Sequence, residues 1–253
     1  MKIDFAMSRK IIAVIALSSM TFVHAAETVK IGFIDLLSGP FALTGQNSLK
    51  QLREVVIQMN AKASATDPKF EIVDFDNKGS PQESLNVLKA ANDRGIHYIT
   101  QGGGSGVALA LVDALNKLAE REPERATVYL NYSAMDPSLT NERCSFWHFR
   151  FDAHADMRMS ALMQVLKTDR KVKSVYLIGQ DYSFGQAVLR EARHQIGVQR
   201  PDMHIVGDEL HPVGRVKDFL PYAAKIKASG AHAVITGNWG NDLTLLVKAA
   251  REL

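Results

Sequence analysis

Cysteine is nearly absent from this 253-residue chain, which contains a single one, Cys144. One cysteine cannot form an internal disulfide or build a structural zinc site, because both need several ligating residues at suitable spacing. Cys144 is therefore either a buried apolar residue or the partner of a cysteine beyond Leu253. The eight histidines show no ligand spacing either. The sequence thus predicts no metal site.

Long apolar segments are also missing, apart from one near the N-terminus. Residues 1–10 carry three bases and one acid, and Ile11–Leu17 is an apolar run that weakens toward small residues at Ala25 and Ala26. This order is typical of a secretory signal peptide. A membrane anchor would need about 20 apolar residues, and polar residues in 18–24 interrupt this stretch. We predict a signal peptide over residues 1–25, cleaved near Ala25, and a mature chain that works in the periplasm.

Outside this leader, the sequence has almost no excess of positive over negative charge. The whole sequence has a formal net charge of +3, and most of that excess lies in the predicted signal peptide. The remaining basic clusters, such as Arg170, Lys171 and Lys173, are short and mixed with acids. Such clusters are typical of solvated helix ends. The sequence therefore indicates no nucleic-acid partner.

Motifs of catalysis and cofactor binding are missing as well. The glycine-rich segment Gly102–Gly106 lies between a predicted strand and a helix, where nucleotide folds bind phosphate. Val107 occupies the position at which a dinucleotide fingerprint or a hydrolase elbow requires glycine. The Gly-Lys-Ser/Thr of a P-loop is absent too. We therefore predict a protein that has no cofactor and is not an enzyme.

What the chain does contain is a regular alternation of short β-rich runs and amphipathic helices. Several runs are almost continuously apolar, which is typical of parallel strands covered by helices on both faces. This alternation predicts an α/β fold with mostly parallel, doubly wound sheets. The predicted strands are 29–36, 70–75, 96–100, 127–130, 174–178, 204–206 and 233–236.

A change in composition divides the chain. Residues 141–145 are polar, residues 146–151 are extended and aromatic, and a helix is predicted after Asp152. We interpret this segment as a crossover between two lobes, 27–145 and 146–253. The second lobe would hold only three strands and end in a helix without a stop signal. We therefore expect the second lobe to be incomplete.

Three loops that follow predicted strands have the composition of a binding site. They are Ser38–Gly45, Gly102–Gly106 and Asn131–Met135. Ligands of open α/β sheets bind at the carboxyl ends of the strands. In the second loop, glycines would let a ligand approach the backbone. Ser105 stands there at a helix N-terminus, whose free N–H groups suit a carboxylate.

Several segments match a known family in order along the chain. With the leader and the glycine–serine loop, they resemble branched-chain amino-acid-type (leucine-binding-like) substrate-binding proteins of ATP-binding cassette (ABC) transporters. The resemblance covers essentially the whole mature chain. It implies the type I periplasmic-binding-protein fold, with two α/β lobes that close over a small ligand. The segments are KIGFIDLLSGPFALTGQ (30–46), DPSLTN (136–141), HFR (148–150), DYSFG (181–185) and DFLPYAAKIKASGAHAVITGNWGND (218–242).

The resemblance also places ligand-binding residues in both lobes. Ser105 matches the serine that receives the ligand's carboxylate, and Phe184 matches an aromatic wall. The amino-group half departs from the family, since Met135 replaces a threonine and Asn238 an aromatic residue. A branched-chain amino acid, an aromatic acid, an amide and other carboxylates are therefore all open as ligands. The predicted site consists of Ser105, Ser133, Ala134, Met135, Tyr182, Phe184, Asn238 and Trp239.

The function that the resemblance implies is solute capture. An extracytoplasmic binding protein would hold a small amino acid or related carboxylate between its lobes and deliver it to an ABC permease. Two alternatives stay open. The same pocket could serve an exported sensor domain of a receptor. The scaffold could also carry a secreted hydrolase, in which Ser105 or Ser183 would need a histidine as base.

Overall fold

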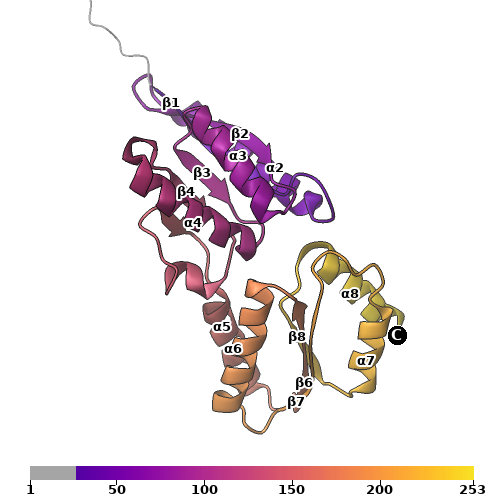
Figure 1. The fold of residues 1–253 in the computed structure, drawn as a ribbon. Helices are drawn as coiled ribbons and strands as arrows, with labels where there is room; N and C mark the ends of the chain where they lie inside the picture. The colour runs from indigo at the N-terminus through magenta and orange to yellow at the C-terminus, as the bar shows by residue number, and fades with distance from the viewer. Residues whose placement is uncertain (1–26) are drawn as a thin grey trace, which may run out of the picture.

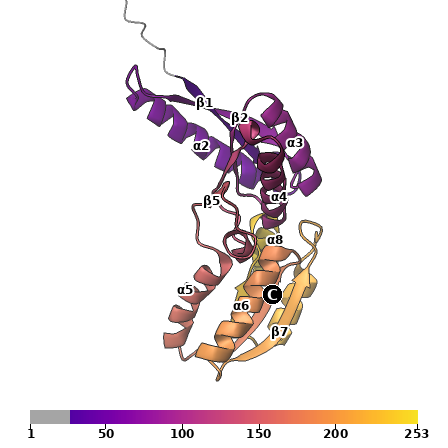
Figure 2. The same cartoon turned by 60° about the vertical axis from the view of Figure 1, so that its left-hand side comes forward.

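A computed structural model describes residues 27–253, which form two α/β lobes (Figures 1 and 2). The first lobe is built on a five-stranded sheet of order β2-β1-β3-β4-β5, and the second on a three-stranded sheet of order β7-β6-β8. All neighbouring strands run parallel. This is the α/β architecture that the alternating pattern predicts. The predicted signal peptide, residues 1–25, lies outside the described residues.

The strands coincide with the apolar runs of the sequence. Phe33 and Ile34 in the first sheet are fully buried, and the central strand of the second sheet is buried along its whole length. Both observations follow from helices covering each face of a parallel sheet. The strands are β1 (Thr28–Asp35), β2 (Lys69–Asp76), β3 (Tyr98–Gln101), β4 (Val128–Asn131), β5 (His148–Arg150), β6 (Ser174–Gln180), β7 (His204–His211) and β8 (Ala233–Thr236).

Helices cover both faces of each sheet. In the first lobe α2 lies on one face, and α3 and α4 lie on the other (Figure 2). In the second lobe α5 and α6 pack on one face of β6, and α7 and α8 pack on the other. Alternate residues of β6 therefore enter different cores. The helices are α2 (Ala42–Lys62), α3 (Pro81–Asp93), α4 (Ser105–Arg121), α5 (Ala155–Thr168), α6 (Ser183–Gln199), α7 (Leu220–Ala228) and α8 (Gly240–Glu252).

Three details differ from the sequence-based expectations. Strand β5 pairs with β4, so the first sheet extends to Arg150, and the expected boundary at 145/146 falls just before its last strand. The predicted loop Ser38–Gly45 is shorter, because α2 already begins at Ala42. Cys144 is exposed, so the expectation of a buried apolar cysteine is wrong. Within residues 27–253, none of the helices is long and apolar enough to span a membrane.

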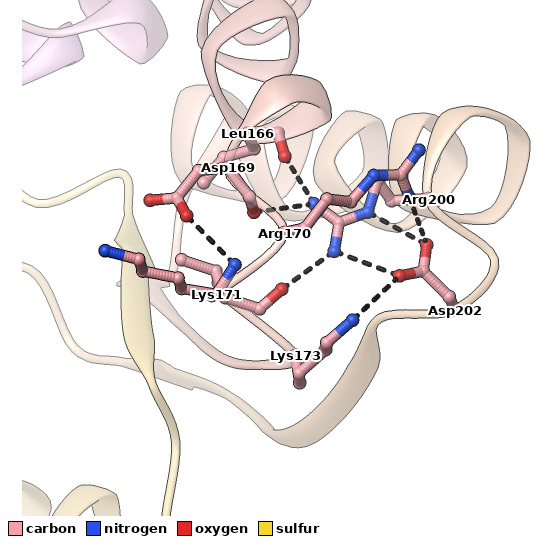
Figure 3. Close-up of polar contacts among 8 residues, drawn as sticks. Leu166, Asp169, Arg170, Lys171, Lys173, Arg200 and Asp202 are labelled. Carbon is pink, nitrogen blue, oxygen red and sulfur yellow. Dashed lines mark hydrogen bonds and ion pairs between the residues drawn. The ribbon is translucent and has the colours of Figure 1, made fainter.

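A wholly buried arginine connects the end of α6 with the end of α5 and with the turns that lead into the second sheet. The side chain of Arg200, which follows α6, has no exposed surface. Its guanidinium donates to the carbonyl oxygens of Leu166, Asp169 (3.2 Å) and Val172 (2.8 Å), and to both carboxylate oxygens of Asp202 at 2.9 and 3.1 Å (Figure 3). Arg200 thereby caps the end of α5 and fixes the turn into β6. The guanidinium holds the pKa of Asp202 at about 2.

Candidate functional site

A cavity of about 180 Å³ lies between the lobes, at the carboxyl ends of strands from both sheets. Parallel α/β sheets bind ligands at this edge. The first lobe contributes the loop after β3, the loop after β4 and the start of α2, and the second contributes the starts of α6 and α8. The lining residues are Thr44, Ser48, Gly102, Gly103, Gly104, Ser105, Tyr132, Ser133, Ala134, Met135, Tyr182, Phe184, Trp239 and Gly240.

Ser105 is the first residue of α4 and lies at the base of the cavity. It is 2% exposed, and its Oγ accepts a hydrogen bond of 3.2 Å from the backbone N–H of Asp136. The hydroxyl proton is therefore available to an acceptor in the cavity. No side chain caps the first turn of α4, and no acid lies in it, so the N–H groups there stay free. A serine donor beside a helix N-terminus is an arrangement that binds a carboxylate.

The glycines before Ser105 serve a different purpose from the one expected. Gly102 and Gly103 donate their N–H groups to the buried carboxylate of Asp35 at 2.9 and 3.1 Å. A Cβ on Gly103 would lie 2.1 Å from Asp35 Oδ1, and one on Gly102 would lie 2.5 Å from the ring of Tyr132. Glycine is therefore required here to pack the loop against its own lobe. The anion donors left to the cavity are those of α4.

Tyr132 is a lining residue that belongs to the predicted loop Asn131–Met135 but was not among the predicted site residues. Its hydroxyl donates to Asp35, and burial first, then the Asp35 charge, raises its pKa well above the usual range. Tyr132 is consequently a neutral wall of the cavity. Ser48 was missed too, although its spacing of four from Thr44, which belongs to the predicted binding loop Ser38–Gly45, places both on one face of α2. That spacing was a usable signal, whereas nothing in the sequence links Tyr132 to Asp35.

The loop after β4 is held by the side chain of Asn131. Its Oδ1 accepts the N–H groups of Ser133 (3.1 Å) and Ala134 (2.7 Å), and its Nδ2 donates to the Ala134 carbonyl at 3.0 Å. These bonds fix the orientation of the Asn131 side-chain amide, with Oδ1 toward the two N–H groups. Nδ2 also lies 3.1 Å from Nε2 of His148, so the imidazole nitrogen must be an unprotonated acceptor. His148 thereby supports the Ser133–Ala134 segment from β5.

We expect the stability of the protein to depend on His148 below neutral pH. Burial first, and then the Arg150 charge, lowers the pKa of His148 from 6.5 to about 4. The unfolded chain binds this proton at higher pH than the folded protein, so the stabilisation is complete above about pH 6.5 and is lost as the pH falls toward 4. Over that pH window the free energy of unfolding of the wild type should fall by up to about 3 kcal/mol relative to that of His148→Gln. Urea unfolding at several pH values measures both.

The matched control for this experiment is His204→Gln, because His204 is exposed. We expect His204→Gln to follow the wild-type pH profile. Equal pH profiles for wild type and His148→Gln would contradict the assignment of His148 as a neutral acceptor.

The second lobe supplies an aromatic wall. Trp239 Nε1 donates to the hydroxyl of Tyr182 at 2.7 Å, and the rings of Tyr182 and Phe184 lie 5.9 Å apart. Burial raises the pKa of Tyr182 well above its usual range. Across the lobe boundary, the ring of Phe41 packs on Trp239 at a centroid distance of 4.5 Å. The cavity thus combines a polar floor from the first lobe with an apolar wall from the second.

The structure brings together all of the predicted site residues except Asn238. Asn238 is 7% exposed and does not line the cavity. Its Oδ1 lies 2.9 Å from Nε2 of His211, the last residue of β7 in the second sheet. The neighbouring Trp239 is directed toward the cavity instead. Asn238 instead lines a neighbouring cavity together with Met135, Phe184 and Trp239.

Comparison with known proteins agrees with this geometry. Residues 28–253 match the family described as periplasmic binding protein. The chain belongs to this family. Its resemblance to branched-chain amino-acid-type substrate-binding proteins and its type I periplasmic-binding-protein fold are confirmed by individual relatives.

Two relatives from Brucella share about a third of their residues with the chain. A Leu/Ile/Val-binding protein homolog 4 of Brucella abortus (strain 2308) is 35% identical over 232 residues, covering 89% of this chain and 54% of the relative. The closed crystal structure of a leucine-, isoleucine-, valine-, threonine- and alanine-binding protein from Brucella ovis is 34% identical, with a TM-score of 0.74. The match covers 90% of this chain and 58% of that one. This periplasmic binding protein therefore spans just over half the length of its relatives.

A more distant structure shares the fold. A solute-binding protein of an ABC transporter from R. palustris, in complex with 4-hydroxybenzoate, is 22% identical with a TM-score of 0.75. The match covers 89% of this chain and 58% of that one. The chain therefore spans only part of the length of this structure as well.

Proposed function

We propose that this periplasmic binding protein captures a small carboxylate-bearing solute, an amino acid or a related acid, between its two lobes. The observation that carries the proposal is the position of Ser105. Its buried hydroxyl and the uncapped start of α4 face a cavity whose opposite wall belongs to the other lobe. A ligand that contacts both walls binds the closed arrangement of the lobes more tightly than an open one, and so favours closure.

The ligand-contacting residues in this proposal come from both lobes. Ser105 and the segment Ser133–Met135 bind the carboxylate end, and Tyr182, Phe184 and Trp239 pack against the rest of the ligand. No charged side chain lines the cavity within residues 27–253, so the wall favours an apolar body. The names of the Brucella relatives support an aliphatic amino acid, and the aromatic lining supports an aromatic acid equally well.

We further propose that the protein is exported by its signal peptide, works in the periplasm and delivers its solute to an ABC permease. The family membership supports this role over that of a receptor's sensor domain. It also supports binding without turnover. Ser105 contacts Asp136 rather than a histidine, and no histidine lines the cavity in the part of the chain that the structure describes. A Ser105-dependent release of product from ester or amide substrates would overturn the proposal.

Ser105→Ala is expected to weaken binding of the solute by roughly ten- to a hundredfold, because a hydrogen bond to a charged group contributes about 1.5–3 kcal/mol. A thermal-shift screen of aliphatic amino acids and aromatic acids identifies a ligand, and calorimetry gives its Kd for both proteins. Exposed Ser64→Ala is the control and should bind as wild type does. If no carboxylate raises the melting temperature, or if Ser105→Ala binds normally, the carboxylate site is placed wrongly.

A further inference from the structure

A second cavity, of about 430 Å³, opens beside the first. The two share Gly103, Gly104, Tyr182 and Trp239 in their walls. The hydrogen-bonded pair of Tyr182 and Trp239 therefore forms part of the boundary between them. Like the first cavity, the second is lined by both lobes.

Two cations line this second cavity from opposite lobes. Lys78 belongs to the loop after β2, and Arg215 belongs to the loop after β7. Both side chains are exposed, and neither forms an ion pair with any residue in 27–253. Among the residues that the structure describes, no acidic side chain lines the cavity. The nearby carboxylates of Asp76 and Asp242 accept backbone N–H groups and pair with neither cation, so both cationic side chains are available to an anion in the cavity.

The loop that carries Lys78 is held in a defined shape. Asp76 Oδ1 accepts the N–H of Lys78 at 2.9 Å, and the buried Asn77 accepts the N–H of Gly79 at 2.9 Å. Lys78 has a φ of 53° and is the non-glycine residue with positive φ in the described part of the chain. This conformation is unfavourable for a lysine and persists because its surroundings impose it. The position of the Lys78 backbone is thus built into the fold.

The loop that carries Arg215 is anchored in a comparable way. The fully buried carboxylate of Asp242 accepts the N–H of Gly214 at 2.9 Å and the Nε2 of Gln180 at 2.8 Å. Gly214 also packs against Phe41 of the first lobe, whose ring would lie 2.8 Å from an added Cβ. Both cations therefore project from loops that are fixed where the lobes meet.

We propose that the second cavity binds a second acidic group of the ligand, so that the solute is a dicarboxylate. One carboxylate lies at Ser105 and the start of α4, the apolar body passes the Tyr182–Trp239 pair, and the other carboxylate lies between Lys78 and Arg215. This inference rests on the proposed function and narrows its substrate class. Because the two cations belong to different lobes, the second carboxylate adds a further contact that favours closure.

The test compares straight-chain dicarboxylates (glutarate, adipate, pimelate) with monocarboxylates of the same carbon number, by calorimetry on the full chain at low ionic strength. Wild type should bind at least one dicarboxylate about tenfold more tightly than its monocarboxylate partner, because the second carboxylate gains charge-assisted contacts from both cations. The gain should shrink as salt is added. The carbon number of the dicarboxylate with the largest gain in affinity indicates the distance between the two anion sites.

The deciding variant is the double substitution Lys78→Met with Arg215→Met, which should reduce the affinity ratio of dicarboxylate to monocarboxylate to about one. Exposed Lys62→Met, outside the cavity, should keep the wild-type ratio. A ratio near one in wild type, or one that survives the double substitution, overturns the dicarboxylate assignment while leaving the Ser105 site intact. Failure of both ligand classes to bind a wild type that binds an amino acid or an aromatic acid overturns the dicarboxylate assignment alone, whereas the proposed function fails only if no carboxylate in the thermal-shift screen binds.

Discussion

Replacing Gly185 with alanine is expected to destabilise the second lobe by more than about 3 kcal/mol. Gly185 is buried in the first turn of α6, where the helix crosses the end of β6. A Cβ there would lie 1.9 Å from the carbonyl oxygen of Gln180 and 3.0 Å from its carbonyl carbon. The clash is with backbone, so no side chain can move aside. The helix would have to lift away from the sheet and open the core that α6 forms with α5 and β6.

The same helix offers a matched control. Gly197 has no atom within 4 Å of an added Cβ and is exposed. Gly197→Ala should leave the fold intact and raise stability by up to about 1 kcal/mol, because alanine is the better helix former. Urea unfolding followed by circular dichroism measures both variants. A Gly185→Ala protein as stable as Gly197→Ala would show that the helix can shift without cost and would refute the close contact.

The other large effect is expected for Arg200→Met, because each buried acceptor that the substitution leaves unsatisfied costs about 1–3 kcal/mol of stability. Methionine fills much of the same space but cannot donate to the three carbonyl oxygens that Arg200 satisfies or to Asp202. Those carbonyls would be left without a partner beside a core, and an unsatisfied buried acceptor is costly. Because the bonds hold the end of α5 and the turn into β6, we expect the second lobe to unfold at a lower urea concentration.

Arg170 provides the comparison for this prediction. It contacts the same Asp202, at 3.4 Å, but its side chain is 64% exposed. Arg170→Met should change stability by less than about 0.5 kcal/mol, as exposed ion pairs contribute little. Both variants are measured by the same urea titration. If the two substitutions had equal effects, the contribution of Arg200 would be a surface charge effect and not the buried network of Figure 3.

Much of the fold could be predicted because it depends on local patterns. The apolar runs that become β1 and β6 are continuous, and a continuous run is what a strand covered on both faces requires. Ser80 and Pro81 are residue types that favour the start of a helix, and Ser80 caps α3 by accepting the N–H of Glu83. The sequence also predicts an extended, aromatic segment around His148. Its pairing with β4 could not be seen, because strand pairing joins residues far apart in sequence.

The candidate site was predictable to the extent that it depends on chain order. Loops that follow parallel strands meet at one edge of a sheet, so Ser105 and Ser133 could be placed together. The direction of each side chain was not predictable. Asn238 and Trp239 are adjacent, yet one contacts His211 and the other lines the cavity. Gly102 and Gly103 of the β3–α4 loop donate to Asp35, and Gly102 packs against Tyr132. Both partners are distant from these glycines in the sequence.

The sequence by itself determined the strand–helix alternation, the two lobes and the serine at a helix N-terminus, because each follows from the spacing of residue types along the chain. The tertiary structure alone decided which groups face one another. The buried Asp35 uses the N–H groups of Gly102 and Gly103, and Lys78 and Arg215 come to a shared cavity from separate lobes. The physical reason is that hydrogen bonds, packing and charge act through distances in space, which the order of residues along the chain does not give.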